Sequence, residues 1–171
     1  GEVAAIMEAF IRVSQGSSEG ILVAGYSGIG KTAIVNEVHK PILKARGYFL
    51  AGKFDQYKRD IPYAAIAKAV SELIEQLLTE SSQKIKLWKE KILEAVGENG
   101  GVIIDVIPEV ELIIGSQPEV SQLGPTESQN RFNRVFKQFT SVFCQQEHPL
   151  VMFIDDLQWA DGASLKLLEL L

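Results

Sequence analysis

The sequence predicts an α/β fold in which a parallel sheet is flanked by helices. Three apolar runs have the length of buried strands, at about residues 21–25, at 48–51 and at 151–154. Segments with helical periodicity separate these runs, and helical crossovers are what join parallel strands. A glycine-rich loop follows the first run and two acidic residues follow the third. The ends of these strands are therefore the places where we expect a ligand site.

The loop after the first run fits the phosphate-binding pattern G-x-x-x-x-G-K-[ST]. Its glycines let successive backbone N–H groups point inward, and the start of the following helix adds partial positive charge where phosphates would lie. Lys31 is expected to reach the β- and γ-phosphates, and the Thr32 hydroxyl to ligate Mg²⁺. The residues expected to bind the nucleotide are Gly25, Tyr26, Ser27, Gly28, Ile29, Gly30, Lys31 and Thr32.

The third apolar run ends in Asp155 and Asp156. A strand that ends in this way is typical of the Walker B motif, whose aspartate helps to hold the magnesium ion. Asp155 is the candidate metal ligand. Asp156 is a candidate catalytic residue together with Lys31, because an acid next to the γ-phosphate could polarise an attacking water. Asp161 has a different interpretation, as the N-cap of the helix that follows.

The composition is that of one soluble globular domain, with 171 residues, 46% of them hydrophobic and 23% charged. The net charge is -5 and no basic block occurs, which argues against nucleic acid as a partner. No apolar stretch is long enough to insert into a membrane. The single cysteine, Cys144, excludes an internal disulfide framework, so we expect a cytoplasmic protein. Cys144 is expected to be at least half-buried on a helix.

The helical periodicity fixes the rest of the predicted fold. A helix is expected over residues 2–14, and Pro41 is expected to kink or break the helix after the phosphate loop near His39. Residues 60–145 are mostly helical in pattern, with 102–115 open between short strands and an irregular helix. Such a stretch is too long for a simple crossover.

We therefore predict one P-loop NTPase domain over residues 1–171, with a large helical insert between its second and third strands. The insert is expected to pack as a helical layer beside the sheet.

With both motifs in place, the chain resembles the nucleotide-binding domain of the signal-transduction ATPases with numerous domains (STAND), a branch of the AAA-related P-loop NTPases. It is most similar to the ATPase module of large bacterial, notably cyanobacterial-type, multidomain serine/threonine and histidine kinases. The residues that carry this resemblance are 23–32, Gly52-Lys53-Phe54-Asp55-Gln56, 59–63 and Phe153-Ile154-Asp155-Asp156-Leu157-Gln158-Trp159-Ala160-Asp161.

The resemblance implies an ATP-driven switch. Binding of ATP or ADP with Mg²⁺, and slow hydrolysis, would toggle the module between states that kinase or sensor domains of the same polypeptide read. A nucleotide-dependent oligomer stays open. Only Gly1 and Glu2 remain of an opening Gly-Arg-Glu element, and the chain stops at Leu171 before the family's later strands and sensor residues. We therefore expect a C-terminally truncated piece of a longer protein that lacks a central strand.

Three functions stay open at this point. The first is a magnesium-dependent ATPase. The second is a nucleotide-binding module with negligible hydrolysis, whose helical insert is a docking surface. Asp156 keeps this alternative open, because many hydrolytic relatives carry glutamate at that position. The third is a small-molecule kinase, which would need lid arginines; Arg59 is a candidate, but its neighbours Lys58 and Asp60 are typical of a solvated loop.

Overall fold

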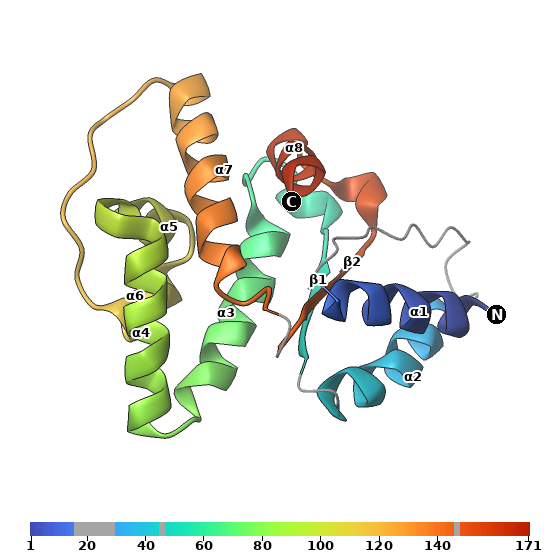
Figure 1. Ribbon diagram of the computed structural model, residues 1–171. Helices are drawn as coiled ribbons and strands as arrows, with labels where there is room; N and C mark the ends of the chain where they lie inside the picture. Colours follow the sequence, from blue (N-terminus) through green and yellow to red (C-terminus); the bar gives the residue numbers. More distant parts are fainter. Residues whose placement is uncertain (16–29, 45–46, 146–147) are drawn as a thin grey trace. The chain divides into compact units, whose positions relative to one another are not determined.

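The computed structural model describes residues 1–15, 30–44, 47–145 and 148–171 (Figure 1). The chain divides into two compact units, which are described separately. The first comprises residues 1–50 and 143–153, and the second comprises residues 51–142 and 154–171. The predicted first strand at 21–25 and most of the phosphate loop lie outside the described residues.

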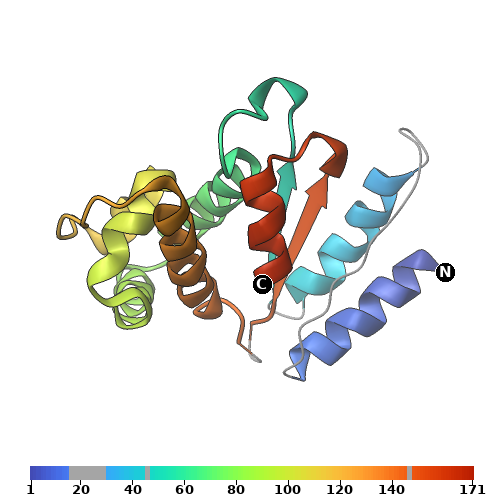
Figure 2. The same ribbon diagram turned by 90° about the horizontal axis from the view of Figure 1, so that it is seen from above.

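The sheet of the described chain consists of β1 (Tyr48–Lys53) and β2 (Leu150–Asp155), which are neighbours. The two strands run in the same direction (Figure 2). At one end the N–H of Tyr48 donates to the carbonyl of Pro149 at 2.8 Å, and at the other the N–H of Phe54 donates to the carbonyl of Asp155 at 3.1 Å. Two of the three predicted strands and their parallel pairing are therefore confirmed. β1 extends two residues beyond the predicted run.

In the first unit, α1 (Glu2–Ser14) lies beside α2 (Lys31–Lys44). The predicted helix over residues 2–14 is confirmed. Pro41 is expected to kink or break the second helix, but it does not break it, because α2 continues through it to Lys44. Ile42, the next residue, is fully buried in a cluster with Phe10 and Val38. Burial of that side chain counters part of the cost of a proline inside a helix.

The second unit is mostly helical between the two strands, as expected from residues 60–145. That this stretch is an insert within a P-loop core stays a prediction. Its longer helices are α3 (Ala64–Leu78), α4 (Ser82–Val96) and α7 (Pro125–Ser141), followed after β2 by α8 (Gly162–Leu170). The open segment 102–115 is an irregular helix made of α5 (Gly100–Val106), a 3-10 turn η3 (Pro108–Val110) and α6 (Glu111–Ile114).

The apolar stripes of these helices meet in one core. Helix α4 contacts both α6 and α7, and α5 contacts α7. The helical periodicity predicts core faces on these helices, and all but one of the side chains on them are buried, Ile85 being only partly buried. The buried ones are Tyr63, Ile66, Val70, Leu73, Ile74, Leu77, Trp88, Ile92, Val96, Phe132, Val135, Phe136 and Phe139. The expectation for Cys144 is wrong, because α7 ends at Ser141 and the thiol is exposed beyond it.

Candidate functional site

The structure describes only the end of the predicted phosphate loop, which is Gly30 and the helix after it. Gly30 has φ +99, in the left-handed region where glycine carries no penalty. Helix α2 starts at the next residue, and the N–H of Ile34 donates to the carbonyl of Gly30 at 3.1 Å. The helix predicted after the phosphate loop is therefore confirmed, as α2. Gly25, Tyr26, Ser27, Gly28 and Ile29 lie outside the described residues, and the side chains of Lys31 and Thr32 are not described.

Asp155 is the last residue of β2, at the carboxyl end of the strand. One carboxylate oxygen, Oδ1, accepts the N–H of Asp156 at 2.8 Å, which fixes the side chain beside the strand end. Within the described ranges no hydrogen bond engages the other oxygen. This half-buried carboxylate is thus held in place and keeps lone pairs for a hard cation.

Strand β2 ends at Asp155 because the backbone turns at Asp156. Asp156 has φ 55 and ψ 45, and aspartate is one of the few residues with a side chain that tolerates this left-handed conformation. Its Oδ2 lies 3.4 Å from the Nζ of Lys53, at the end of β1, and its Oδ1 accepts from Nε2 of Gln158 at 3.4 Å. The side chain of Asp156 is 27% exposed and that of Lys53 is 72% exposed.

The turn after Asp156 is held by packing. The 3-10 turn η4 (Leu157–Trp159) closes with the N–H of Trp159 on the carbonyl of Asp156 at 2.9 Å. Trp159 packs against a cluster of Phe54, Ala65 and Ala160. Trp159 is therefore a packing anchor beneath the turn.

Asp161 caps α8, as predicted, and it also makes a contact that the sequence did not indicate. Its Oδ2 accepts the N–H of Ser164 at 2.9 Å, and its Oδ1 accepts the hydroxyl of Ser164 at 2.7 Å. The same Oδ2 accepts the N–H of Tyr63 at 3.3 Å, from the residue before α3. The carboxylate is only 9% exposed, so these donors replace the water it loses on folding.

Tyr63 extends this network into the helices of the second unit. Its hydroxyl donates to Oδ1 of Asn133 on α7 at 3.1 Å, and its ring centroid lies 4.3 Å from that of Phe132. Its backbone is left-handed, with φ 64. Burial raises the pKa of the Tyr63 phenol, and the negative charge of Asp161 raises the pKa further.

The remaining polar residues near the end of β1 form an exposed loop. Asp55 accepts the N–H of Tyr57 at 2.9 Å and so caps the 3-10 turn η1 (Gln56–Lys58). Gln56 and Arg59 are exposed. Asp55 has a structural role here, and the exposure of Arg59 agrees with its prediction in a solvated loop.

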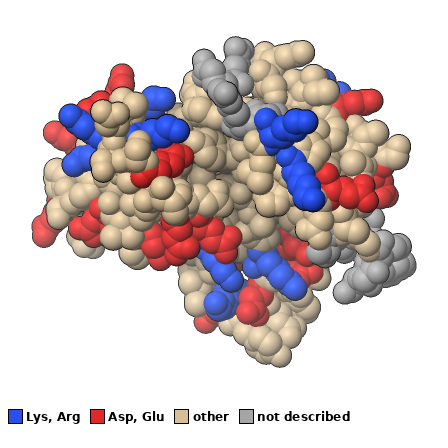
Figure 3. Space-filling model, turned by 90° about the horizontal axis from the view of Figure 1, so that it is seen from below, with Lys and Arg blue, Asp and Glu red and all other residues tan. Residues whose placement is uncertain are grey.

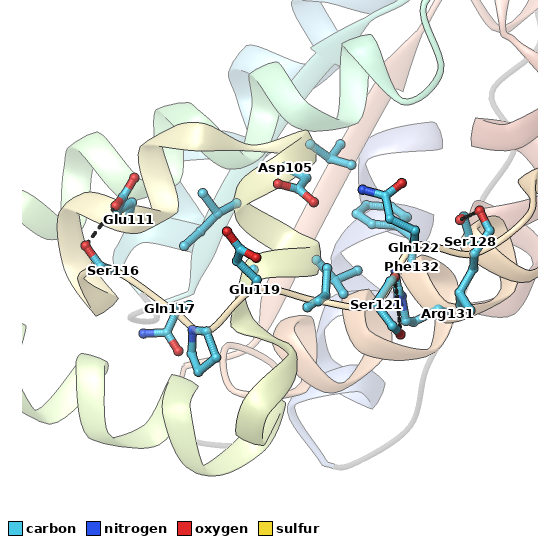
Figure 4. Close-up of a pocket in the computed structure, with 17 residues that line it drawn as sticks. Asp105, Glu111, Ser116, Gln117, Glu119, Ser121, Gln122, Ser128, Arg131 and Phe132 are labelled. Carbon is cyan, nitrogen blue, oxygen red and sulfur yellow. Dashed lines mark hydrogen bonds between the residues drawn. The ribbon is translucent and has the colours of Figure 1, made fainter.

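The second unit also has a cavity of about 620 Å³, which lies under the loop 115–124 between α5, α6 and α7 (Figure 4). Its charged lining is Asp105, Glu111, Glu119 and Arg131. Nη1 of Arg131 donates to the carbonyl of Ser121 at 2.8 Å, which ties the loop to α7. Three carboxylates against one guanidinium disfavour phosphate, so this cavity is not a candidate for the nucleotide.

Three further features of the described residues bear on function: the distribution of surface charge, the grouping of possible metal ligands, and the length and apolarity of the helices. On the face shown in Figure 3, basic and acidic side chains are interspersed. The described residues contain no group of three or more His, Cys, Asp or Glu side chains that could hold a metal by themselves. Magnesium needs fewer protein ligands when phosphates and waters complete its shell. In the described part of the chain, no helix has the length and apolarity to cross a membrane.

With this geometry established, the comparisons with known proteins identify the family. A family model described as "AAA ATPase domain" matches residues 1–171. The chain therefore belongs to the AAA ATPase domain family. No solved structure matches it.

Three histidine kinases are similar to this chain. Hybrid signal transduction histidine kinase G of Dictyostelium discoideum is 42% identical over 171 residues, which are 99% of this chain and 5% of that protein. Histidine protein kinase 1 of Candida albicans is 21% identical over 164 residues, and peroxide stress-activated histidine kinase mak2 of Schizosaccharomyces pombe is 25% identical over 169 residues. Each of these two alignments covers 86% of this chain and 7% of the kinase.

These relatives support the expected link to signalling kinases but not the expected bacterial origin. They are histidine kinases, in line with the resemblance to signalling kinases. They come from eukaryotes, so they give no support to a bacterial, cyanobacterial-type origin. The chain spans only 5% to 7% of the length of the relatives that it matches.

Proposed function

We propose that the chain is the nucleotide-dependent switch of a multidomain histidine kinase, which binds ATP or ADP with Mg²⁺ and hydrolyses ATP slowly. One observation carries the proposal. A parallel strand ends in two aspartates, Asp155 and Asp156. The chain that contains it matches the AAA ATPase domain over residues 1–171 and has a phosphate-loop motif that leads into a helix.

Each candidate residue has a role that fits its chemistry. The N–H groups of the loop from Gly25 to Thr32 bind phosphate oxygens, and Lys31 neutralises charge on the β- and γ-phosphates. Thr32 and Asp155 supply hard oxygen donors, which suit Mg²⁺, and the ion would offset charge on the phosphate oxygens. Asp156 orients and polarises the attacking water. It lies one residue beyond the proposed metal ligand, on the turn that ends β2.

The partners follow from the relatives. Since they are histidine kinases many times longer than this chain, we propose that kinase or sensor domains of the same polypeptide read the bound nucleotide. A nucleotide-dependent oligomer of the STAND type belongs to the same proposal.

A second candidate function is a nucleotide-binding module with negligible turnover. The contacts of Asp156 favour it, because Lys53 and Gln158 both engage the carboxylate that would have to face the water. Such a module would hold nucleotide as a regulatory ligand and expose its helices as a docking surface.

The two candidates separate in an experiment on the intact protein. Binding of ATP and steady-state phosphate release are measured for the wild type, for Asp156→Asn and for Asp60→Asn, an exposed acid of the η1 loop as a matched control. The switch function predicts that Asp156→Asn lowers turnover by roughly 100-fold or more, keeps ATP affinity, and differs from Asp60→Asn in this respect.

Wild type that binds ATP with no turnover above Asp156→Asn would establish the second candidate instead. Wild type that binds no nucleotide would contradict both.

A further inference from the structure

The buried contact between Asp161 and Tyr63 joins two parts of the chain that are 98 residues apart. Asp161 follows the turn that begins at Asp156, and Tyr63 precedes α3. Beyond capping α8, the Asp161 carboxylate therefore fixes where the turn lies against the start of α3. Capping alone requires the bonds to Ser164 and does not require the bond to Tyr63.

Backbone strain marks both sides of this contact. Among the described residues, Tyr63 and Asp156 are the two that have positive φ without being glycine. Such conformations persist where the surroundings determine them, and they gather at functional sites. For Tyr63 the determining contacts are the bonds to Asp161 and Asn133 and the ring of Phe132. Tyrosine has no local hydrogen bond of its own that would favour this backbone.

We propose that Asp161 is a positioning residue of the nucleotide site, which sets the turn carrying Asp156 and couples it through Tyr63 to α3 and α7. The contacts form a continuous path. Asp156 precedes η4, and Asp161 follows it two residues later. Asp161 accepts the N–H of Tyr63, whose hydroxyl donates to Asn133 on α7. If the turn moved when nucleotide binds or leaves, Tyr63 would be displaced, and the displacement would reach α7 through the hydrogen bond to Asn133. This inference rests on the proposed function, in which Asp156 acts on the nucleotide.

Two substitutions at Asp161 separate positioning from capping. Asparagine keeps an oxygen for the N–H groups of Ser164 and Tyr63, and its amide can donate to the hydroxyl of Ser164, so Asp161→Asn preserves the geometry. Serine is a good N-cap, but its single shorter oxygen leaves the N–H of Tyr63 without a partner. Asp161→Ser therefore keeps the cap on α8 and removes the hydrogen bond to the N–H of Tyr63.

A cap elsewhere in the unit supplies the control for stability. Ser81 accepts the N–H of Lys84 at 3.3 Å and caps α4. Ser81→Ala removes a helix cap that has no connection to the turn. The fall in Tm of Ser81→Ala is the reference with which the fall in Tm of Asp161→Ser is compared.

The experiment measures ATP affinity, turnover and hydrogen exchange of α7 amides, with and without nucleotide, in the intact protein and these three variants. We expect Asp161→Ser to lower turnover between about 10- and 100-fold with nearly unchanged affinity, since small displacements of a reacting group have effects of this size. It should also abolish the nucleotide-dependent change in exchange at α7. Asp161→Asn and Ser81→Ala should behave as the wild type in both measurements.

Two results would overturn the inference. Turnover and exchange in Asp161→Ser equal to those in Ser81→Ala would show that Asp161 is only a cap, with the proposed function intact. Wild type that binds no nucleotide would refute the proposed function and this inference with it. If Asp161→Ser is unfolded at the assay temperature, Tyr63→Phe replaces it, because it removes only the hydroxyl that reaches Asn133 and should uncouple α7 alone.

Discussion

Lys53 Nζ lies 3.4 Å from Oδ2 of Asp156, so the ends of two neighbouring strands are joined by an ion pair next to the candidate metal ligand. Lys53 is 72% exposed, and ion pairs between exposed side chains contribute between about 0 and 1 kcal/mol. The pair is thus weak enough to break when Asp156 acquires another partner. It supplies positive charge beside a carboxylate without fixing the fold.

The first prediction concerns this pair. Lys53→Gln should lower the free energy of unfolding by less than about 1 kcal/mol, and the difference from wild type should vanish near 1 M salt because exposed charges are screened. Urea denaturation at low and high salt measures both effects, with Lys53→Arg as the charge-conserving control. A loss above about 2 kcal/mol that persists in high salt would contradict the account.

The second prediction tests the left-handed backbone of Asp156. Glycine and alanine both remove the carboxylate, but only alanine has a Cβ that this conformation crowds. Asp156→Gly should therefore be more stable than Asp156→Ala by about 1 kcal/mol, although both lose turnover. Thermal unfolding of the two variants gives the comparison. Equal stabilities would mean that the turn relaxes.

The third prediction concerns the packing of β1 against α3. A Cβ on Gly52 would lie 3.1 Å from both the carbonyl oxygen of Ala65 and Cδ1 of Ile154, whereas a Cβ on Gly162 meets nothing within 4 Å. Gly52→Ala should destabilise by about 1–3 kcal/mol through overpacking. Gly162→Ala should be neutral or slightly stabilising. Chemical denaturation distinguishes them, and a harmless Gly52→Ala would show that the strand end is loosely packed.

The fourth prediction uses the raised pKa of Tyr63, which burial and then the charge of Asp161 cause. The phenol has an ordinary pKa of 10.0 in the unfolded chain and a higher pKa in the folded one. Its contribution to stability is therefore complete below pH 10.0 and is lost as the pH rises through the folded value.

The difference in unfolding free energy between wild type and Tyr63→Phe should be constant well below pH 10.0 and should shrink as the pH rises above 10.0. The other titrating groups are common to both proteins and cancel in the difference. A pH-independent difference would mean that the phenol is accessible to water.

The parts of this structure that the sequence predicted depend on local patterns. The cap by Asp161 spans three residues, and the buried stripes of α3, α4 and α7 follow helical spacing. The two acids at the end of β2 were found because an apolar run leads directly into them.

The contacts that the sequence did not indicate depend on tertiary structure. The bond from Tyr63 to Asp161 and the pair of Lys53 with Asp156 join residues that the parallel crossover brings together, and no spacing encodes them. Helix α2 passes through Pro41, and the next residue, Ile42, is buried in a cluster with Phe10 and Val38, a tertiary contact that no local pattern encodes. Cys144 is exposed because α7 ends three residues before it.

The central claim is that this chain binds a nucleotide through its phosphate loop. The most direct test is equilibrium binding of ATP, ADP and GTP to the intact protein with and without Mg²⁺, with Lys31→Ala as the control. The account predicts binding of ATP or ADP that Mg²⁺ strengthens and that Lys31→Ala abolishes without a change in Tm. A folded wild type that binds none of the three, or a Lys31→Ala variant that binds as tightly as wild type, would contradict it.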